Sequence, residues 1–221
     1  GLDTADSAAW GSGRLLFESA RFDRWEMENG TLRRIHQEDF CQATGHRSAQ
    51  KYQARGGPAY ADIVHVIRRH TANPLRDIDV LASWVLFNLL VGNNDAHAKN
   101  LALLYTPDGL QLAPVYDVVS THVYPHLDRQ FSIEVGGQRT PEALHRTALD
   151  KFARSLGMKP AAVARLGEPL IDRARGQVAS VFGQVASQHA HAPVLDQIHD
   201  LILERAVLLE NWLAAGLGPR P

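Results

Sequence analysis

Cysteine is almost absent from this sequence, which has Cys41 alone among its 221 residues. A disulfide framework within the chain is therefore excluded, and this cysteine usage fits the reducing environment of the cytoplasm. Free cysteine is among the most frequently buried residue types, so we expect Cys41 to be a small core residue and not a nucleophile.

An excess of charge of one sign and a long apolar run are also lacking. The formal net charge is -1 at pH 7, so no overall field draws the chain toward nucleic acid or an anionic membrane. The most apolar stretch, 78–91, contains Asp79 and Asn88. It is shorter than the roughly 20 residues that a membrane-spanning helix needs, and it predicts a buried helix. No signal peptide is visible at the first residues.

The patterns that are present predict an α+β fold that is mainly helical. Near the N-terminus, 14–22 has the composition of a strand, and the turn signal Asn29-Gly30 leads to a partner strand at 31–35. A second hairpin, with strands 101–105 and 110–115, is joined by the turn Thr106-Pro107-Asp108-Gly109. Helical spacing of apolar residues, with caps and breaks, predicts helices at 37–44, 61–70, 77–91, 141–156, 161–181 and 196–213.

Polar residues gather on both flanks of the second hairpin. Asp95 and Asn100 precede it, five positions apart, and Asp117 follows it. Because a short turn brings the outer ends of paired strands together, we expect Asn100 and Asp117 to lie close in space. Phosphoryl transfer needs one carboxylate for the acceptor hydroxyl and separate oxygen ligands for magnesium, and protein kinases use an Asp and an Asn at this spacing.

Three other interpretations stay open at this point. Asn93, Asn94 and Asp95 are residue types that often cap helices and form turns. A metal hydrolase would need a histidine pair such as His122 and His126, but Pro125 argues against a shared helix. A nucleic-acid-binding module would use basic pairs such as Arg33-Arg34, which are more often a solvated face.

The hairpin flanks resemble the signature of HipA-family serine/threonine kinases, the toxins of bacterial toxin–antitoxin systems. The resemblance lies in the motifs Asn94-Asp95-Ala96-His97-Ala98-Lys99-Asn100 and Leu112-Ala113-Pro114-Val115-Tyr116-Asp117. Segments 20–24, 36–42 and 51–58 resemble the family's hinge strand, the segment after it and the next loop. The match runs from about Leu15 to Ser120 in the family's order, and it implies the C-terminal lobe of a bilobal kinase.

The resemblance implies a role for each matching residue. Asp95 would be the catalytic base, and Asn100 and Asp117 would hold Mg²⁺. Backbone groups at Ala20 and Phe22 would contact the adenine of ATP, and Asp23 would contact its ribose. Ala20 departs from the acidic residue that is usual there, which matters little because the family uses the backbone. The remaining residues implied to line the nucleotide site are Gln37, His97, Lys99 and Tyr116.

A kinase also needs a phosphate-covering loop and a lysine on an N-lobe strand, and both precede the hinge. Before Phe22 this sequence has no lysine, and Gly11-Ser12-Gly13 favours a turn. We therefore expect residues 1–35 to lead from an N-lobe that is missing, residues 36–221 to form the helical C-lobe, and the chain alone to have little or no activity. An antitoxin-binding scaffold of the same fold is the alternative.

The family also implies partners. It associates with a HipB-like DNA-binding antitoxin, so that contact of this chain with DNA would be indirect. The acceptor would be a protein, for example an aminoacyl-tRNA synthetase or another translation component.

Overall fold

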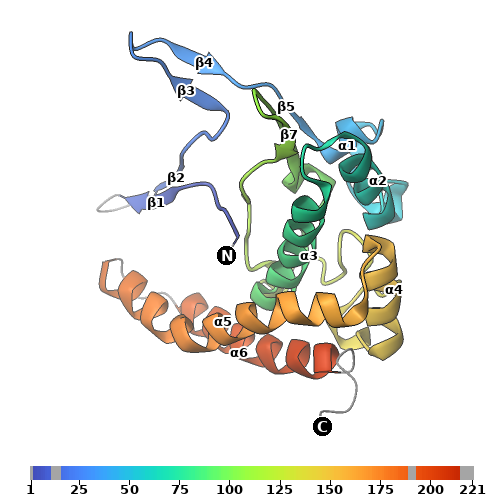
Figure 1. The fold of residues 1–221 in the computed structure, drawn as a ribbon. Helices are drawn as coiled ribbons and strands as arrows, with labels where there is room; N and C mark the ends of the chain where they lie inside the picture. The colour runs from blue at the N-terminus through green and yellow to red at the C-terminus, as the bar shows by residue number, and fades with distance from the viewer. Residues whose placement is uncertain (1, 11–15, 189–192, 215–221) are drawn as a thin grey trace.

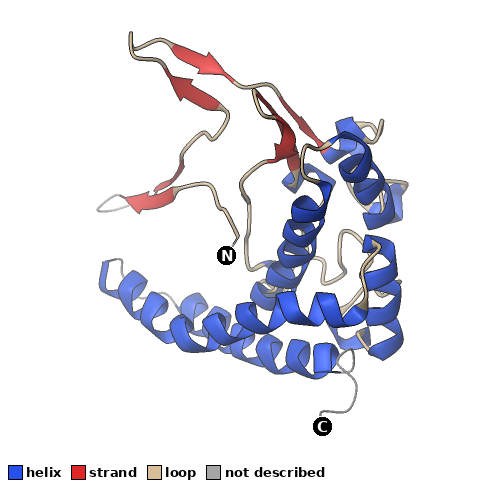
Figure 2. Ribbon diagram, viewed as in Figure 1, coloured by secondary structure: helices blue, strands red, loops and turns tan. Residues whose placement is uncertain are grey.

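The computed structural model describes residues 2–10, 16–188 and 193–214. Helices dominate, and three small antiparallel sheets lie toward the N-terminal side (Figures 1 and 2). The predicted α+β, mainly helical class is therefore confirmed. The turn predicted at Gly11-Ser12-Gly13 lies outside the described residues.

Helix α3 (Pro74–Val91) forms the centre of the helical body. Asn73 caps its first turn by accepting a hydrogen bond from the Arg76 amide, and Gly92 ends it in the left-handed conformation, with φ of 70°. The helix is apolar nearly all round and is buried as expected. It packs against α5 (Pro160–Gln188) and α6 (Pro193–Ala214), which run antiparallel beside each other (Figure 1).

Two shorter helices complete the body. Helix α2 (Tyr60–His70) packs on α3 and on α4 (Arg146–Leu156). The helix predicted at 141–156 is in fact split, because His145 accepts a hydrogen bond from the Ala148 amide and starts α4 anew. Single 3₁₀ turns occupy Ser48–Gln50, Gln53–Arg55, Ala98–Asn100, Thr121–Val123 and Pro141–Ala143.

The predicted second hairpin is present as β6 (Ala102–Thr106) and β7 (Gly109–Leu112), with Thr106 opposite Gly109. A third strand, β5 (Gln37–Asp39), pairs with β6 and overturns the helix expected at 37–44. Only α1 (Phe40–Ala43) is helical there, because Asp39 caps it and the residues before the cap pair with a strand distant in sequence.

The N-terminal strands form two separate ribbons. Strand β1 (Ser7–Trp10) pairs with β2 (Leu16–Ser19), and β3 (Arg24–Glu26) pairs with β4 (Leu32–Arg34) across the Asn29-Gly30 turn. The hairpin expected between 14–22 and 31–35 is therefore wrong in its pairing, although its turn is right. The ribbons extend from the helical body (Figure 1), and their exposed apolar residues include Phe17, Trp25 and Leu32.

Two compositional expectations can be compared with the structure. Cys41 is buried, as predicted, and burial raises the pKa of its thiol. Among the helices of the described residues, none combines the length and apolar character needed to cross a membrane.

Candidate functional site

The loop between α3 and β6, residues 92–100, is held rigidly from both sides. A Cβ atom on Gly92 would lie 2.5 Å from Leu201 Cδ2 and 3.1 Å from His122 Cβ, so the close packing at this turn favours glycine. The Asn94 amide N–H donates to Thr121 Oγ1 at 2.8 Å, and the Asn94 carbonyl accepts from the Ser132 hydroxyl at 2.9 Å. The residue that follows, Asp95, therefore starts from a fixed backbone.

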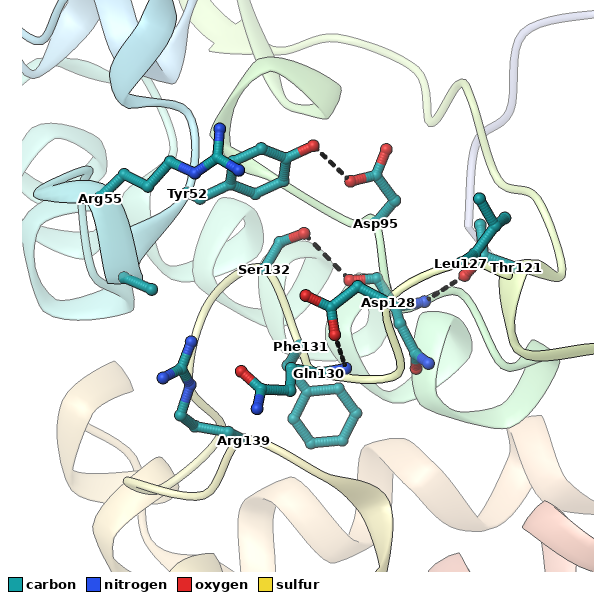
Figure 3. Close-up of a pocket in the computed structure, with 12 residues that line it drawn as sticks. Tyr52, Arg55, Asp95, Thr121, Leu127, Asp128, Gln130, Phe131, Ser132 and Arg139 are labelled. Atoms are coloured by element: carbon teal, nitrogen blue, oxygen red, sulfur yellow. Dashed lines mark hydrogen bonds between the residues drawn. The ribbon is translucent and has the colours of Figure 1, made fainter. Parts of the chain in front are cut away.

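Asp95 presents its carboxylate to solvent at the rim of a pocket of about 290 Å³ (Figure 3). The side chain is 52% exposed, and its Oδ1 accepts a hydrogen bond from the Tyr52 hydroxyl at 3.0 Å. Its own amide N–H donates to Asn93 Oδ1 at 3.1 Å. The Asp95 carboxylate is thus oriented by the Tyr52 hydroxyl, its backbone is held by Asn93, and it remains accessible to a molecule that enters the pocket.

Both charged and apolar side chains line the pocket. Arg55 and Arg139 lie on the wall away from Thr121, and Asp128 and Phe131 line its lower part in Figure 3.

His97, two residues after Asp95, is buried among polar groups. Its Nε2 lies 2.7 Å from Lys51 Nζ and 3.9 Å from Asp95 Oδ2, and its ring meets the Tyr52 ring edge-on at 5.6 Å. Burial, and then the neighbouring Lys51 ammonium, lower the pKa of His97. The imidazole is neutral near pH 7, and Nε2 accepts a hydrogen bond from the Lys51 ammonium.

Asn100 and Asp117 are brought together at the outer ends of the hairpin, as predicted. The Asn100 Nδ2 group donates to Asp117 Oδ2, and Asn100 Oδ1 accepts from the His97 amide at 3.0 Å. Asp117 has φ of 57°, the only positive φ of a non-glycine residue in the part of the chain that the structure describes. Such a conformation costs about 1–3 kcal/mol and is typical of functional positions.

Carboxylate and amide oxygens are ligands that Mg²⁺ prefers, so Asp117 and Asn100 fit this metal by their chemistry, with the Asn100 amide nitrogen facing Asp117 in this structure. Within the described residues, no group of three or more His, Cys, Asp or Glu side chains could hold a metal ion. His122, the first half of the alternative histidine pair, instead contacts Asn94 and Arg205.

Two of the expected nucleotide-site residues connect the ribbons to the hairpin. The Tyr116 ring lies 5.5 Å from the Phe22 ring, and the Tyr116 hydroxyl donates to the Lys99 carbonyl at 2.6 Å. Burial raises the pKa of Tyr116. Lys99 Nζ donates to Ser48 Oγ at 3.0 Å, and Gln37 Oε1 is buried without a hydrogen-bond partner among the described residues.

The remaining two residues are engaged inside the ribbons. The Ala20 amide donates to the Asp6 carbonyl at 2.8 Å. Asp23 is buried, and both of its oxygens accept from Arg21 at 2.7 Å, while Arg24 reaches Oδ2 at 2.5 Å. The arginines, Arg21 above all, lower the pKa of Asp23 to about 2. Among the described residues, no hydrogen bond or ion pair joins Ala20 or Asp23 to Asp95, Asn100 or Asp117.

One buried network was not foreseen from the sequence. Arg205 on α6 is 1% exposed, and its Nη2 lies 3.1 Å from His122 Nε2 and 3.4 Å from Glu142 Oε1. His122 Nδ1 in turn lies 3.2 Å from the Asn94 side-chain amide, beside Asp95. A signal exists in the sequence: Arg205 falls at helical spacing on the same stripe as Ile202 and Leu209, where an arginine must find a buried partner.

Comparison with known proteins gives consistent results. The sequence model described as HipA-like C-terminal domain matches residues 1–179. A putative kinase of Sinorhizobium fredii is 34% identical over 210 residues, which are 95% of this chain and 50% of that protein. The serine/threonine-protein kinase toxin HipA of Shewanella oneidensis is 32% identical over 151 residues, 62% of this chain and 34% of the relative.

Solved structures agree on the fold. HipA from the Shewanella oneidensis complex of HipA, HipB and operator DNA superposes with a TM-score of 0.87 at 22% identity, covering 100% of this chain and 55% of that one. The Helicobacter pylori proinflammatory kinase CtkA gives a TM-score of 0.62 at 12% identity, covering 97% and 77%. The chain thus spans about half the length of these HipA-type relatives.

Proposed function

We propose a function for this chain on the premise that it belongs to the family of HipA-like C-terminal domains: it is the catalytic lobe of a serine/threonine protein kinase that transfers the γ-phosphate of ATP to a protein hydroxyl. The observation that carries the proposal is the convergence of Asp95, Asn100 and Asp117 around one loop and one hairpin. Kinase relatives support the reaction class.

Asp95 is the proposed base. Its exposed carboxylate faces a pocket that can admit a polypeptide segment, and Tyr52 fixes one of its oxygens. In the proposed step the acceptor hydroxyl oxygen forms a bond to the γ-phosphorus, and the bond from that phosphorus to the β–γ bridging oxygen breaks. ADP leaves with the electron pair of that bond, and the hydroxyl proton goes to Asp95.

Asn100 and Asp117 are the proposed holders of Mg²⁺, which when bound neutralises charge on the phosphates. The Asn100 amide now turns its nitrogen to Asp117 while its oxygen accepts from the His97 amide. The left-handed backbone at Asp117 and the hairpin before it fix the position of the Asp117 carboxylate. Both are present without a bound ligand.

The nucleotide contacts are proposed around two aromatic rings. Phe22 and Tyr116 contact each other at a tilt where the ribbon meets the hairpin, with Lys99, His97 and Gln37 nearby on the same loop and sheet. Ala20 and Asp23 are engaged by neighbours in the ribbon, so adenine and ribose binding there requires exchange of those partners. We propose that this exchange accompanies closure with an N-lobe, and that the chain alone binds ATP poorly.

By analogy with the solved complex of HipA, HipB and operator DNA, we propose a HipB-like antitoxin as the partner. The protein acceptor is proposed at the level of class only, a seryl or threonyl hydroxyl in a segment that fits the pocket beside Asp95.

The decisive experiment is Asp95→Asn in a complete kinase chain that contains this lobe. Transfer of ³²P from ATP to the kinase itself and to dephosphorylated casein should fall by about 10²–10⁴-fold, the range that general base catalysis contributes. Mg-ATP affinity, measured by calorimetry, should stay within a factor of about three, because Asp95 acts on the acceptor. Asp108→Asn, the same change in the exposed turn of the hairpin, is the control.

Retention of full transfer activity by Asp95→Asn would contradict the proposed function. Calorimetry also compares the 221-residue chain with the complete kinase. If only the complete kinase binds Mg-ATP tightly, the result supports a lobe that needs an N-lobe for nucleotide binding. Tight binding by the 221-residue chain would show a self-sufficient nucleotide site.

A further inference from the structure

The proposed mechanism leaves one charged group beside Asp95 without a task. Phosphoryl transfer spreads negative charge over the transferring oxygens, and kinases place cations there in addition to magnesium. Among the described residues, the ammonium that contacts the cluster of Asp95 and His97 is that of Lys51, through His97. Lys99 turns away from this cluster, because its Nζ donates to Ser48 Oγ.

Lys51 reaches the cluster from residues 51–58, the Lys51 loop, which is distant from Asp95 in sequence. Its Nζ donates to His97 Nε2 at 2.7 Å, and the side chain is partly buried. An ammonium has three N–H donors and no acceptor, and no other hydrogen bond from Lys51 Nζ is recorded within the described residues. Nζ also lies 4.8 Å from the centre of the Tyr52 ring, and two of its donors remain without a hydrogen-bond acceptor in the part of the chain that the structure describes.

The backbone of the Lys51 loop is attached to the 92–100 loop at several points. The Ala98 amide donates to the Lys51 carbonyl at 3.4 Å, and the next residue, Tyr52, binds Asp95 through its hydroxyl. The Gly57 amide in turn donates to the Tyr52 carbonyl at 3.0 Å, and a Cβ atom on Gly57 would lie 2.1 Å from the Gln50 carbonyl oxygen. The position of the ammonium relative to the Asp95 carboxylate is thus fixed from both sides.

We propose that Lys51 is a further catalytic residue, whose ammonium binds the transferring phosphoryl group while Asp95 accepts the acceptor's proton. The inference rests on the proposed function and adds to it a cation supplied by this lobe, separate from any N-lobe lysine. His97 holds the ammonium in place through Nε2, and the free N–H groups face the oxygens on which charge develops. Lys51 takes no part in the proton transfer to Asp95, so the step balances as before.

A purely structural role for Lys51, as a clamp between the two loops, makes a different prediction. A clamp would affect the binding of all nucleotide states alike. A group that binds the transferring phosphoryl oxygens affects the transition state far more than the ground state.

The test uses the complete kinase and the variants Lys51→Met and Lys51→Arg. Lys51→Met should lower ³²P transfer to the kinase itself and to dephosphorylated casein by about 10²–10³-fold, the loss typical of removing one preorganised donor. Affinity for Mg-ADP should stay within a factor of about three. Affinity for Mg-ADP with aluminium fluoride, which mimics the transferring group, should fall by a factor similar to that of the rate. Lys51→Arg should recover part of both losses.

Lys151→Met removes the same charge from the exposed face of α4 and should change none of these quantities. The proposal is overturned if Lys51→Met transfers phosphate at a rate close to that of the parent protein, or if Mg-ADP and its aluminium fluoride complex weaken equally. In either case the Asp95→Asn result still decides the proposed function by itself. Loss of transfer in Lys51→Met with unchanged aluminium fluoride binding also contradicts the proposal.

Discussion

The 92–117 region and the N-terminal ribbons differ in how their functional groups are held. Asp95, Asn100 and Asp117 lie on a loop and hairpin whose neighbours are buried side chains, among them Leu103 and Leu112. The ribbons β1–β4 expose the apolar side chains of Phe17, Trp25 and Leu32, and Asp23 is satisfied by adjacent arginines.

This difference separates two halves of one proposed site. The transfer half is preorganised, because its loop is fixed by hydrogen bonds from Asn93 to Asn88 of α3, from Asn94 to His122, and between His97 and Lys51. The adenine half lies on ribbons with few contacts of their own to the helical core. A chain that spans about half the length of its relatives therefore holds the proposed base and metal ligands, and by the same proposal it needs more protein to hold ATP.

The largest contrast in stability should come from truncating a leucine in each region. Leu103→Ala in β6 removes a side chain that is 1% exposed and should lower the free energy of unfolding by about 2–5 kcal/mol. Leu32→Ala in β4 removes one that is 66% exposed and should change it by less than about 0.5 kcal/mol. Urea unfolding of the chain measures both, and equal losses would mean that the ribbons are as well packed as the hairpin.

The same contrast explains what could be predicted from the sequence. Local patterns were sufficient for α2, α3, the β6–β7 hairpin and the meeting of Asn100 with Asp117, because caps, turns and periodicity act over a few residues. Local patterns gave a wrong prediction at 37–39. The order of apolar and polar residues there is compatible with a helix, but the backbone pairs with β6.

Contacts between distant segments gave no local signal. Lys51 meets His97 across 46 positions, and Arg205 meets His122 across 83. Phe17 and Leu32 lie in segments whose composition correctly predicts strands. The predicted pairing of these two strands with each other is wrong, because an apolar face does not specify which neighbouring strand it pairs with.

A smaller effect should follow from adding one methyl group in the Lys51 loop. Gly57→Ala places a Cβ atom 2.1 Å from the Gln50 carbonyl oxygen and 2.8 Å from that of Tyr52. We expect a loss of about 1–3 kcal/mol in unfolding free energy, as for other overpacked sites. Gly176→Ala in α5 has open space and helical backbone, so it should stabilise by about 0.5–1 kcal/mol. The same sign for both variants would contradict this packing.

The next effect concerns Mg²⁺ in the transfer half. Asp117→Asn in the complete kinase replaces a carboxylate ligand by an amide and should weaken Mg-ATP binding about tenfold, or about 1.4 kcal/mol. Binding of ATP without magnesium should improve or stay the same, because a negative charge near the phosphates is removed. Calorimetry with and without Mg²⁺ separates the two, and equal changes in both would show that Asp117 does not hold the metal.

The smallest effect should lie in the ribbons and depend on pH. Asp23 has a folded-state pKa of about 2, below its ordinary value of 3.8, chiefly because Arg21 hydrogen-bonds to the carboxylate. Its stabilising contribution is therefore complete above pH 3.8 and is lost as pH falls through 2. The effect is modest because the Arg21 side chain is 60% exposed and its ion pair is screened by solvent.

The local reporter is the Ile35 amide, which donates to the Asp23 carbonyl at 2.9 Å. Its protection from hydrogen exchange should fall between pH 4 and pH 2, whereas amides in α3 keep theirs over that range. Asp23→Asn should remove the pH dependence at Ile35. The contrary result is that the protection of Ile35 and of α3 declines together in the parent protein and in Asp23→Asn. Acid would then unfold the ribbons and the helical body as one cooperative unit, and the ribbons would not be a separate unit as their exposed side chains indicate.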